Sequence, residues 1–363
     1  MNPATTDLMI QTAFNASTWM HLAGRTRNRR CLKIPATPRA FAGIRRGIFL
    51  QSPSIHLASA TAGHRLQVRV KIAVILNPKA GSVSDLAPIL KQIKRLKPAL
   101  CFITRKPGAA KRFAAEAIRK GCDYIIAAGG DGTLNEVVNG IARHAGKVRL
   151  GLLPLGTGND FARCLDLPTT LAENIDILRA WKTRRIDLVR VKSDRSRYFV
   201  NVSAGGFSGL VDEKLTPEIK KAWGPLAYLR SAAAALPELR AYRTSVRFTP
   251  RKTSSQDLYT VIIANGRYVA GGLPIAPEAD PSDGLLDVIL IPQRPAPEIA
   301  LLTARIMLGK HLGSDSIIFR RVPKISIRSR PGMWFNLDGE LVGNEPATFE
   351  VIPGALQFVV EKT

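Results

Sequence analysis

The sequence predicts an α/β domain built on a parallel sheet, followed by a mainly antiparallel β-sandwich domain. As far as about residue 186, short apolar runs alternate with helical patterns of roughly 10 to 12 residues, which is typical of parallel βαβ units. Beyond that point strand-like runs dominate and few helices separate them, which favours an antiparallel sandwich. We therefore expect a leader over 1–69, the first domain over 70–186 and the sandwich over 187–346, with 347–363 as a candidate to return to the first domain.

The elements of the first domain follow from apolar runs and helical spacing. Residues 71–77 (KIAVILN) form a β-branched run that ends in Asn-Pro, the pattern of a buried strand that enters a turn. Apolar residues from Leu86 to Ile93 then recur at helical spacing, with Ser84 as the expected N-cap. By the same criteria we expect strands at 100–104, 124–128 and 149–154, and helices at 109–120 and 134–143.

The second domain shows runs with strand character and only two helical segments. The expected helices are 218–239 and 297–312. The expected strands are 198–202, 258–264, 285–291, 324–329, 334–337, 348–352 and 356–360.

The charge of the chain divides between a leader and the folded part. The chain has 53 Lys+Arg and 28 Asp+Glu, a formal net charge of +25. Ten basic residues and one acid in 1–69 give +9, which leaves +16 for the remaining 294 residues. The leader is rich in Ser, Thr and Ala, so it is either a transit peptide or an extension from a misassigned start. We favour the second, because the regular pattern begins abruptly at Val70.

Composition excludes several classes of protein. No run approaches the roughly 18 to 20 apolar residues that a membrane-spanning helix needs. The four cysteines and five histidines lack the spacing of zinc sites or of a disulfide scaffold. We therefore expect a cytoplasmic protein with free thiols.

A glycine-rich loop follows the predicted strand at 124–128, where open α/β sheets bind ligands. In Gly129-Gly130-Asp131-Gly132-Thr133 the glycines permit close approach to a phosphate, and the following helix N-terminus favours an anion. The Asp131 carboxylate would repel a bare phosphate, so we expect a cation, Mg²⁺, between them. A structural alternative is that Thr133 caps the helix and Glu136 completes a capping box.

Two further loops suit the same phosphate cleft. Gly156-Thr157-Gly158-Asn159-Asp160 follows the strand at 149–154, but Phe161 stands where a dinucleotide fingerprint needs its third glycine. Alone it is typical of a helix-initiating turn capped by Asn159 or Asp160. Asn77-Pro78-Lys79-Ala80-Gly81 follows the first strand. Together the three loops predict the walls of one cleft.

In order along the chain, these motifs resemble the lipid kinase family of diacylglycerol and sphingosine kinases, especially its bacterial members. The matching segments are NPKAG (77–81), GGDGTLNEVVNG (129–140), LPLGTGNDFAR (153–163), IDL (186–188), NVSAGGFSG (201–209), APEADPSDGLLDV (276–288) and LDGE (337–340). The resemblance covers nearly all of 71–363 and leaves out the leader. It implies a first domain like those of NAD kinase and phosphofructokinase, a lipid-binding sandwich, and an ATP:lipid phosphotransferase.

The resemblance also implies where ATP lies and what holds it. The nucleotide is expected between the two domains, with Asp160 linked to the metal and charge network. Its expected contacts are Asn77, Pro78, Lys79, Gly81, Thr104, Gly129, Gly130, Asp131, Gly132, Thr133, Asn135, Glu136, Gly156, Thr157 and Asp160.

Catalytic and metal roles come from the same resemblance. The LDGE motif is expected to supply the general base, Glu340 with Asp338 as the alternative, and Asp131 joins them as a catalytic residue. A structural Mg²⁺ is expected at the Asp283-Gly284 turn, with backbone oxygens near Asp280 and Leu285 as further ligands. From spacing alone, LDGE is an exposed turn and residues 281–284 are a plain β-turn.

Three functions are weighed. The first is an ATP-dependent kinase of a diacylglycerol-like or sphingoid hydroxyl. The second is an NAD kinase, which shares the GGDGT turn but not the continuation LNEVVNG and the separate GTGND loop. The third is a nucleic-acid-binding protein, against which the basic residues are dispersed and no zinc-finger or RNP pattern occurs. ATP against GTP and the oligomeric state, with a homodimer among the choices, stay open.

A lipid substrate requires contact with a membrane surface. We expect the +16 of the folded part to attract an anionic leaflet, at about 1 kcal/mol per basic residue near it. The basic residues in question are Lys220, Lys221, Arg320, Arg321, Lys324, Arg328 and Arg330. Trp223 is a candidate for insertion at the interface, although packing is its more common role. Candidate pocket residues are Leu210, Val211, Tyr228, Val269 and Leu273.

Overall fold

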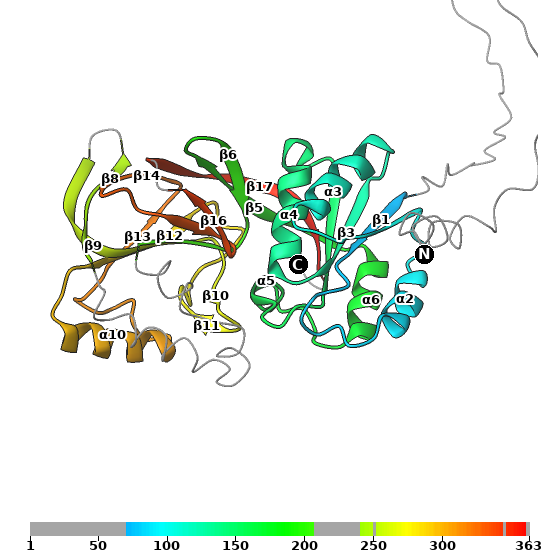
Figure 1. Cartoon of the computed structure of the whole chain (residues 1–363), viewed down its shortest axis with the longest axis horizontal. Coiled ribbons are helices and arrows are strands. Elements are labelled where there is room, and N and C mark those ends of the chain that lie inside the picture. The colour runs from blue at the N-terminus through cyan, green and yellow to red at the C-terminus, as the bar shows by residue number, and fades with distance from the viewer. Residues whose placement is uncertain (1–69, 207–239, 250–251, 344–345, 361–363) are drawn as a thin grey trace, which may run out of the picture. The chain divides into compact units, whose positions relative to one another are not determined.

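The first domain is a parallel sheet with helices on both faces (Figure 1). The computed structural model describes residues 70–206, 240–249, 252–343 and 346–360, all within the unit Leu66–Thr363. The strand order is β2 (Leu100–Ile103), β1 (Ile72–Leu76), β3 (Tyr124–Gly129), β4 (Arg149–Pro154) and the end of β17 (Ala347–Val359). Every neighbouring pair is parallel. Strands β1 and β3 are buried along their whole length, which explains their continuous apolar sequences.

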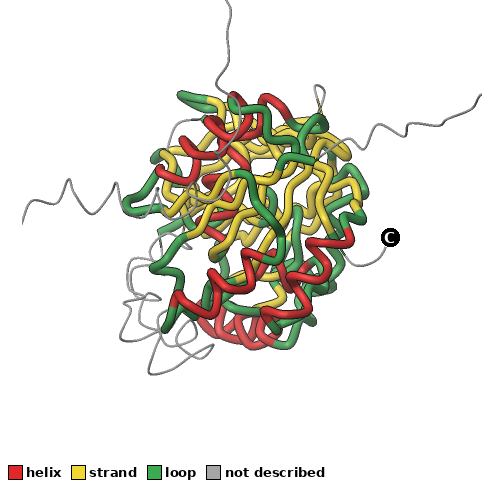
Figure 2. The backbone as a smooth tube through the Cα atoms, turned by 90° about the vertical axis from the view of Figure 1, so that its right-hand side faces the viewer, coloured by secondary structure: helices red, strands yellow, loops and turns green. Residues whose placement is uncertain are grey.

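Helices cover the two faces of this sheet in pairs. Helices α3 (Ala109–Arg119) and α4 (Asp131–Ile141) pack on one face through a core that includes Ala114 and Val138. Helices α2 (Leu86–Lys94) and α6 (Leu171–Ala180) pack on the other face through Ile93 and Leu178. The 3₁₀ turn η1 (Ala142–His144) and the short helix α5 (Asp160–Cys164) complete the domain. Figure 2 shows the strands gathered in the interior and helices towards the outside.

The second domain consists of two antiparallel sheets that share the long strand β9 (Lys252–Ala264). One sheet joins β9 to β8 (Tyr242–Thr249), β14 (Lys324–Arg330), β17, β5 (Thr183–Lys192) and β6 (Ser196–Phe199). The other joins β9 to β12 (Leu286–Pro292), β13 (Ile318–Val322), β7 (Val202–Gly206), β15 (Phe335–Leu337) and β16 (Glu340–Gly343). A core that includes Val246, Leu290 and Phe349 lies between the sheets.

One helix and one small hairpin lie outside the sandwich core. Helix α10 (Ala296–Met307) packs Leu302 against the outer side of the second sheet, where it meets Ile262 and Ile289. The hairpin of β10 (Tyr268–Val269) and β11 (Leu273–Pro274) forms a separate two-stranded sheet. A parallel α/β domain followed by an antiparallel sandwich is the predicted fold class, which is confirmed.

Several predicted boundaries differ from the observed ones. The N-cap of α2 is Asp85, not Ser84, and its carboxylate accepts a hydrogen bond of 2.9 Å from the Ala87 N–H. Helix α4 begins at Asp131 instead of residue 134. The helix predicted to reach residue 312 ends at Met307, because Gly309 takes a left-handed φ of 66° just after it. The helix predicted at 218–239 lies outside the described residues.

The two strands predicted near the C-terminus are a single strand, β17. Pro353-Gly354 is a usual turn signal, but here the register of β17 against β5 shifts between Ile352 and Leu356 and the strand continues. Gly354 has a φ of 54°, and its N–H donates to the buried Asp187 carboxylate at 2.6 Å. Asp187 thereby stabilises a bulge where the sequence predicts a turn.

Candidate active site

A cleft of about 780 Å³ brings the three glycine-containing loops together with a turn of the second domain. The loops follow β1, β3 and β4, and the turn joins β15 to β16. Of the predicted site residues, the cleft is lined by Asn77, Lys79, Gly81, Thr104, Gly130, Gly132, Thr133, Asn135, Glu136, Gly156 and Asp338. Pro78, Gly129, Asp131, Thr157 and Asp160 are not part of this lining.

The loops after β3 and β4 touch through their glycines. A Cβ added to Gly156 would lie 2.5 Å from the Gly130 Cα, and a Cβ added to Gly130 would lie 3.0 Å from the Gly156 Cα. The Leu155 N–H also donates to the Gly129 carbonyl at 3.0 Å. Only glycine permits this approach, so the two loops form one continuous backbone floor.

The loop after β1 is joined to the same floor. The Asn77 N–H donates to the Ala128 carbonyl at 2.9 Å, and the Asn77 side-chain amide donates to the Thr133 hydroxyl at 3.2 Å. A Cβ at Gly81 would collide with the Thr157 hydroxyl. Thr157 is therefore in direct contact with Gly81, which lines the cleft.

Glu136 caps a different helix from the one that contains it. Its carboxylate accepts hydrogen bonds of 2.8 and 2.9 Å from the N–H groups of Gly108 and Ala110, at the N-terminus of α3. The capping box within α4 is therefore wrong: its N-cap is Gly130, with no side-chain bond. The negative charge at this helix N-terminus fixes the wall of the cleft.

Asp131 and Asp160 form a carboxylate pair beside the glycine floor. The Asp131 oxygens accept hydrogen bonds of 3.1 Å from the N–H groups of Asp160 and Phe161, so Asp131 caps α5. Asp160 Oδ2 accepts a 3.0 Å hydrogen bond from the Gly271 N–H in the second domain. Burial raises the pKa of Asp160, and the charge of Asp131 raises it further, while the Gly271 and Gly272 N–H groups oppose this.

Asp338 joins the second domain to the first. Its oxygens accept hydrogen bonds from the N–H groups of Val200, Asn201 and Val202 at 3.0 to 3.1 Å. The Asn135 side chain, on α4, donates to Asp338 Oδ2 at 3.2 Å. Burial raises the pKa of Asp338 to about 6, although these donors favour the charged form. At neutral pH the cleft therefore contains an ionised and firmly positioned carboxylate.

With this geometry in view, the comparisons with known proteins identify the family. Residues 71–191 match the diacylglycerol kinase catalytic domain, and residues 201–360 match the YegS C-terminal NAD kinase beta sandwich-like domain. The chain is 35% identical over 256 residues to a protein of Pseudomonas savastanoi pv. phaseolicola named "Probable lipid kinase YegS-like", covering 70% of this chain and 81% of that one. The chain belongs to the diacylglycerol kinase family of lipid kinases. The resemblance found in the motifs is confirmed, and the protein is a kinase-type phosphotransferase for which family membership implies ATP.

Other members of this lipid kinase family agree in sequence or in fold. A diacylglycerol kinase of Staphylococcus saprophyticus is 30% identical over 287 residues, covering 78% of this chain and 92% of that one. The crystal structure of a diacylglycerol kinase from Bacillus anthracis superposes with a TM-score of 0.67 at 23% identity, covering 80% and 97% of the two chains. This second likeness supports the two-domain fold alone.

The lipid kinase cleft is more basic than the motifs indicate. Besides Lys79, it is lined by Arg105, Lys106 and Lys111 near the N-terminus of α3 and by Arg197 from β6. Among the described residues, the acids in the same lining are Glu136 and Asp338. The run Arg105-Lys106-Pro107-Gly108 directly after β2 is a sequence signal for part of this set, whereas Arg197 comes from a distant strand and carries none.

Of the two candidate bases, the structure defines one fully. Asp338 lines the cleft with a positive φ of 47°. Glu340 begins strand β16 two residues later, and its side chain is outside the described part. Kinetic measurements on variants of the two residues therefore decide which of them is the general base.

The two predicted Mg²⁺ sites differ in how well their residues suit a cation. Among the described residues, no three acidic, His or Cys side chains gather into a metal site. Asp280 is paired with Arg184 at 2.8 Å, and Asp283 accepts from the Leu285 N–H at 2.9 Å and lies 3.8 Å from Arg321. Both carboxylates already have basic partners, so a cation at this turn would depend on the backbone oxygens near Asp280 and Leu285.

The Asp131–Asp160 pair fits a cation better. Both carboxylates lie near the position of a Cβ on Gly158, at 3.4 Å for Asp160 Oδ2 and 3.5 Å for Asp131 Oδ2. Asp160 Oδ1 is buried and has no hydrogen-bond partner among the described residues. An unpartnered buried oxygen beside a second carboxylate is a donor set that Mg²⁺ accepts.

The remaining residues are those that the sequence predicts for lipid or membrane contact. Val269 and Leu273 lie on the β10–β11 hairpin and are partly exposed. The predicted basic residues from Arg320 to Arg330 lie on β13 and β14. The other predicted contact residues lie outside the described part: Leu210, Val211, Lys220, Lys221, Trp223 and Tyr228.

Proposed function

We propose that the protein transfers the γ-phosphoryl group of ATP to the hydroxyl of a diacylglycerol-like or sphingoid lipid in the presence of Mg²⁺. One observation carries this proposal: a single cleft joins a glycine-built phosphate floor, five basic side chains and the Asp338 carboxylate of the second domain. Phosphoryl transfer depends mainly on positioned phosphates, charge neutralisation and an oriented nucleophile, and these residues supply all three.

The first domain binds the phosphates. Gly130, Gly132 and Thr133 at the start of α4 line the cleft, and the positive end of that helix favours anions. Lys79 and Lys111 approach from two other walls and neutralise phosphate charge. The close contact of Gly130 with Gly156 leaves this floor free of side-chain carbon, so phosphate oxygens can reach the backbone.

The second domain supplies the base. With a pKa of about 6, Asp338 is ionised at neutral pH and can accept the proton of the attacking lipid hydroxyl. Its four hydrogen bonds, from the N–H groups of residues 200–202 and from Asn135, fix its orientation. Glu340, two residues along the same turn, is the base that the LDGE resemblance favours, and the kinetics of the two variants decide between them.

Mg²⁺ is expected beside Asp131 and Asp160, where it would neutralise charge that the basic residues leave on the triphosphate. Asp131 also orients α5, and Asp160 also holds Gly271, so each carboxylate fixes a neighbouring backbone segment as well.

The test is a transfer assay with the full chain, labelled ATP, Mg²⁺ and a panel of diacylglycerols, sphingoid bases and NAD⁺. We expect chloroform-soluble label with at least one lipid, and its loss in Asp338→Asn. Label in NADP⁺ alone, or in no acceptor while the protein binds ATP, contradicts the proposal. Competition by unlabelled GTP defines the nucleotide.

A further inference from the structure

Leu301 on the outer side of α10 and Leu308, the C-cap residue of this helix, are exposed to solvent. Large hydrophobic side chains that are exposed in the described part include Leu308 at 71% and Leu301 at 55%. They lie two helical turns apart, and single exposed leucines are common whereas an aligned pair is less so. Helix α10 therefore presents apolar surface away from its own domain.

The exposed leucines belong to a continuous stripe. Pro297, Leu301, Ala304 and Leu308 follow one another at intervals of four, three and four residues and are all exposed, so they share one helix face. The opposite face is buried through Leu302 and Ile299. A helix that is apolar on its packed face and also on its outer face calls for a second apolar neighbour.

Basic side chains border the stripe. Arg294 precedes the helix, Arg305 lies beside Leu301, and Lys310 follows Leu308; all three are exposed. Glu298 is the acid within the helix, and it lies 4.0 Å from Arg294. Leucines bordered by Arg and Lys are the composition of helices that lie in the interface of an anionic bilayer.

The stripe leads towards the candidate active site. Beyond Leu308 the chain turns at Gly309, where an added Cβ would lie 3.2 Å from Pro274 of β11. The hairpin that contains Pro274 also contains Gly271, which donates to Asp160. Apolar surface on α10 and the carboxylate pair beside the phosphate floor are thus joined through one hairpin.

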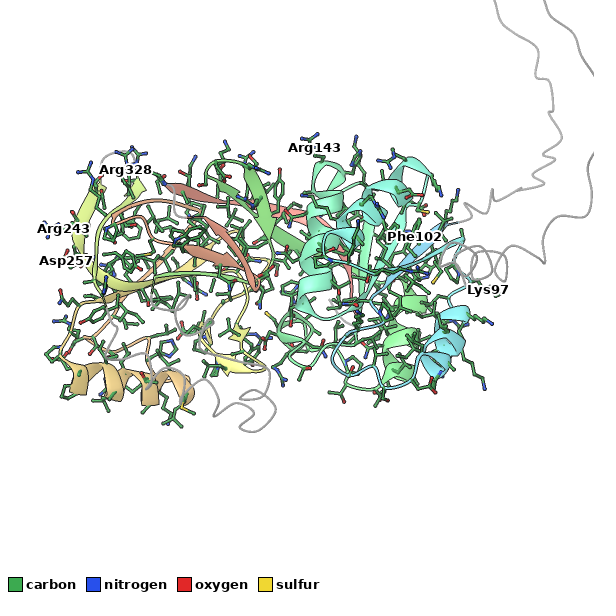
Figure 3. The ribbon with its side chains drawn as sticks, viewed as in Figure 1. Lys97, Phe102, Arg143, Arg243, Asp257 and Arg328 are labelled. Atoms are coloured by element: carbon green, nitrogen blue, oxygen red, sulfur yellow. The ribbon has the colours of Figure 1, made fainter. Side chains whose placement is uncertain are left out.

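We propose that the outer face of α10, the stripe Pro297-Leu301-Ala304-Leu308, docks the protein on an anionic lipid bilayer. This inference rests on the proposed function, since a lipid acceptor must be met at its membrane. A second copy of the chain is a weaker occupant, because two leucines offer far less than the ~800 Å² per partner of a standard stable interface. Nucleic acid would meet polar, basic surface, such as that of Arg243 and Arg328, which Figure 3 shows away from α10.

Vesicle co-sedimentation of the full chain tests the proposal. The vesicles contain phosphatidylcholine and phosphatidylglycerol. Binding to them is compared between the wild type, the double variant Leu301→Gln/Leu308→Gln and a control, Thr253→Gln/Ser255→Gln. The control changes two exposed residues of β9. We expect the leucine variant to lose binding by about tenfold, with an unchanged Tm, and the control to bind like the wild type. Leu301→Ala/Leu308→Ala is expected to lie between them.

Three results would overturn the docking surface. The first is equal binding by the leucine variant and the wild type. The second is loss of binding only in Arg243→Gln/Arg328→Gln, which would place the contact on the opposite side. The third is a wild-type dimer that the leucine substitutions dissociate while vesicle binding persists.

A second substrate form separates this inference from the proposed function. With a short-chain acceptor dispersed as monomers, the leucine variant is expected to keep its kcat/KM within about twofold of the wild type and to lose activity only on vesicles. A wild type that binds vesicles through these leucines but phosphorylates no lipid would remove the kinase proposal and keep the docking surface. If the wild type phosphorylates both the monomeric acceptor and the vesicle lipid, and the leucine variant is equally active on vesicles, the kinase proposal stands and the docking surface is wrong.

Discussion

Asp338 and Glu136 show that the acids of this cleft each hold a distant part of the chain. Asp338 collects three N–H groups of the segment 200–202 and the side chain of Asn135. Glu136 collects two N–H groups at the start of α3. Each carboxylate therefore holds backbone segments in place as well as contributing charge to the cleft. Measurements of kinetics and of the free energy of unfolding separate these two roles.

Asp338→Asn is expected to lower kcat by about 10²- to 10⁴-fold while ATP binding stays within a few-fold, because a base acts on the hydroxyl and not on the nucleotide. In the wild type, kcat/KM should fall about tenfold per pH unit below the pKa of about 6. Steady-state kinetics from pH 5 to 8 measure this. If Glu340→Gln removes the fall of kcat/KM at low pH and Asp338→Asn does not, Glu340 is the base.

The same carboxyl has a defined effect on stability. Its folded-state pKa, about 6, lies above its ordinary value of 3.8, so the folded state holds the extra proton between those values. This group alone therefore makes the free energy of unfolding decrease as pH rises from about 4 to 6. Urea titrations should show a smaller decrease over that window in Asp338→Asn, and an unchanged pH dependence would contradict the shifted pKa.

Glu136→Ala is expected to lower the free energy of unfolding by about 1 to 2 kcal/mol, because two N–H groups at the start of α3 lose their acceptor. Glu116→Ala is the matched control: Glu116 lies on α3 and forms a surface pair of 2.8 Å with Lys120, worth about 0.5 kcal/mol or less. Urea denaturation compares them. Equal effects would contradict the capping role of Glu136.

Sequence patterns found these residues but not all of their partners. The glycine loops could be predicted because each has a local requirement, a turn beside a helix start. The capping box between Thr133 and Glu136 was wrong because its spacing is local, whereas the real donors, Gly108 and Ala110, lie more than 25 residues away. Contacts of this kind have no signal within a single sequence window.

At the scale of elements, the contact between the loops after β3 and β4 decides the shape of the floor. Gly156→Ala places a Cβ 2.5 Å from the Gly130 Cα, so one loop must shift. We expect loss of stability by about 1 to 3 kcal/mol and weaker ATP binding.

Gly132→Ala is the control for this substitution. Gly132 lies in helix α4, and an added Cβ meets nothing within 4 Å. We expect its stability to stay equal or to rise by up to about 1 kcal/mol, since Ala is the better helix former. Thermal unfolding and ATP titration compare the two, and a destabilised Gly132→Ala with an unaffected Gly156→Ala would contradict the packing described.

Elements were predictable where periodicity was strong and less so where long-range pairing decides. The buried strands β1, β3 and β4 were found from their apolar runs. Strand β17 was divided in two because Pro353-Gly354 has the chemistry of a turn, and the acceptor that makes it a bulge, Asp187, lies on another strand. A local turn signal was overridden by a tertiary hydrogen bond.

At the scale of the whole molecule, β17 couples the two domains. It pairs antiparallel with β5, joins the sandwich through β14, and pairs parallel with β4 of the first sheet. We therefore expect residues 70–363 to unfold in one cooperative transition, with calorimetric and van't Hoff enthalpies that agree. Two resolved transitions would show that the domains unfold independently.

The central claim is that the cleft transfers a phosphoryl group to a lipid hydroxyl. The most direct measurement is ³¹P NMR of the products that the full chain forms from ATP, Mg²⁺ and a dispersed diacylglycerol. The account predicts one lipid phosphomonoester for each ADP, with both formed about 10²- to 10⁴-fold more slowly by Asp338→Asn. ADP without lipid phosphate, or a phosphorylated dinucleotide in its place when NAD⁺ is present, would contradict it.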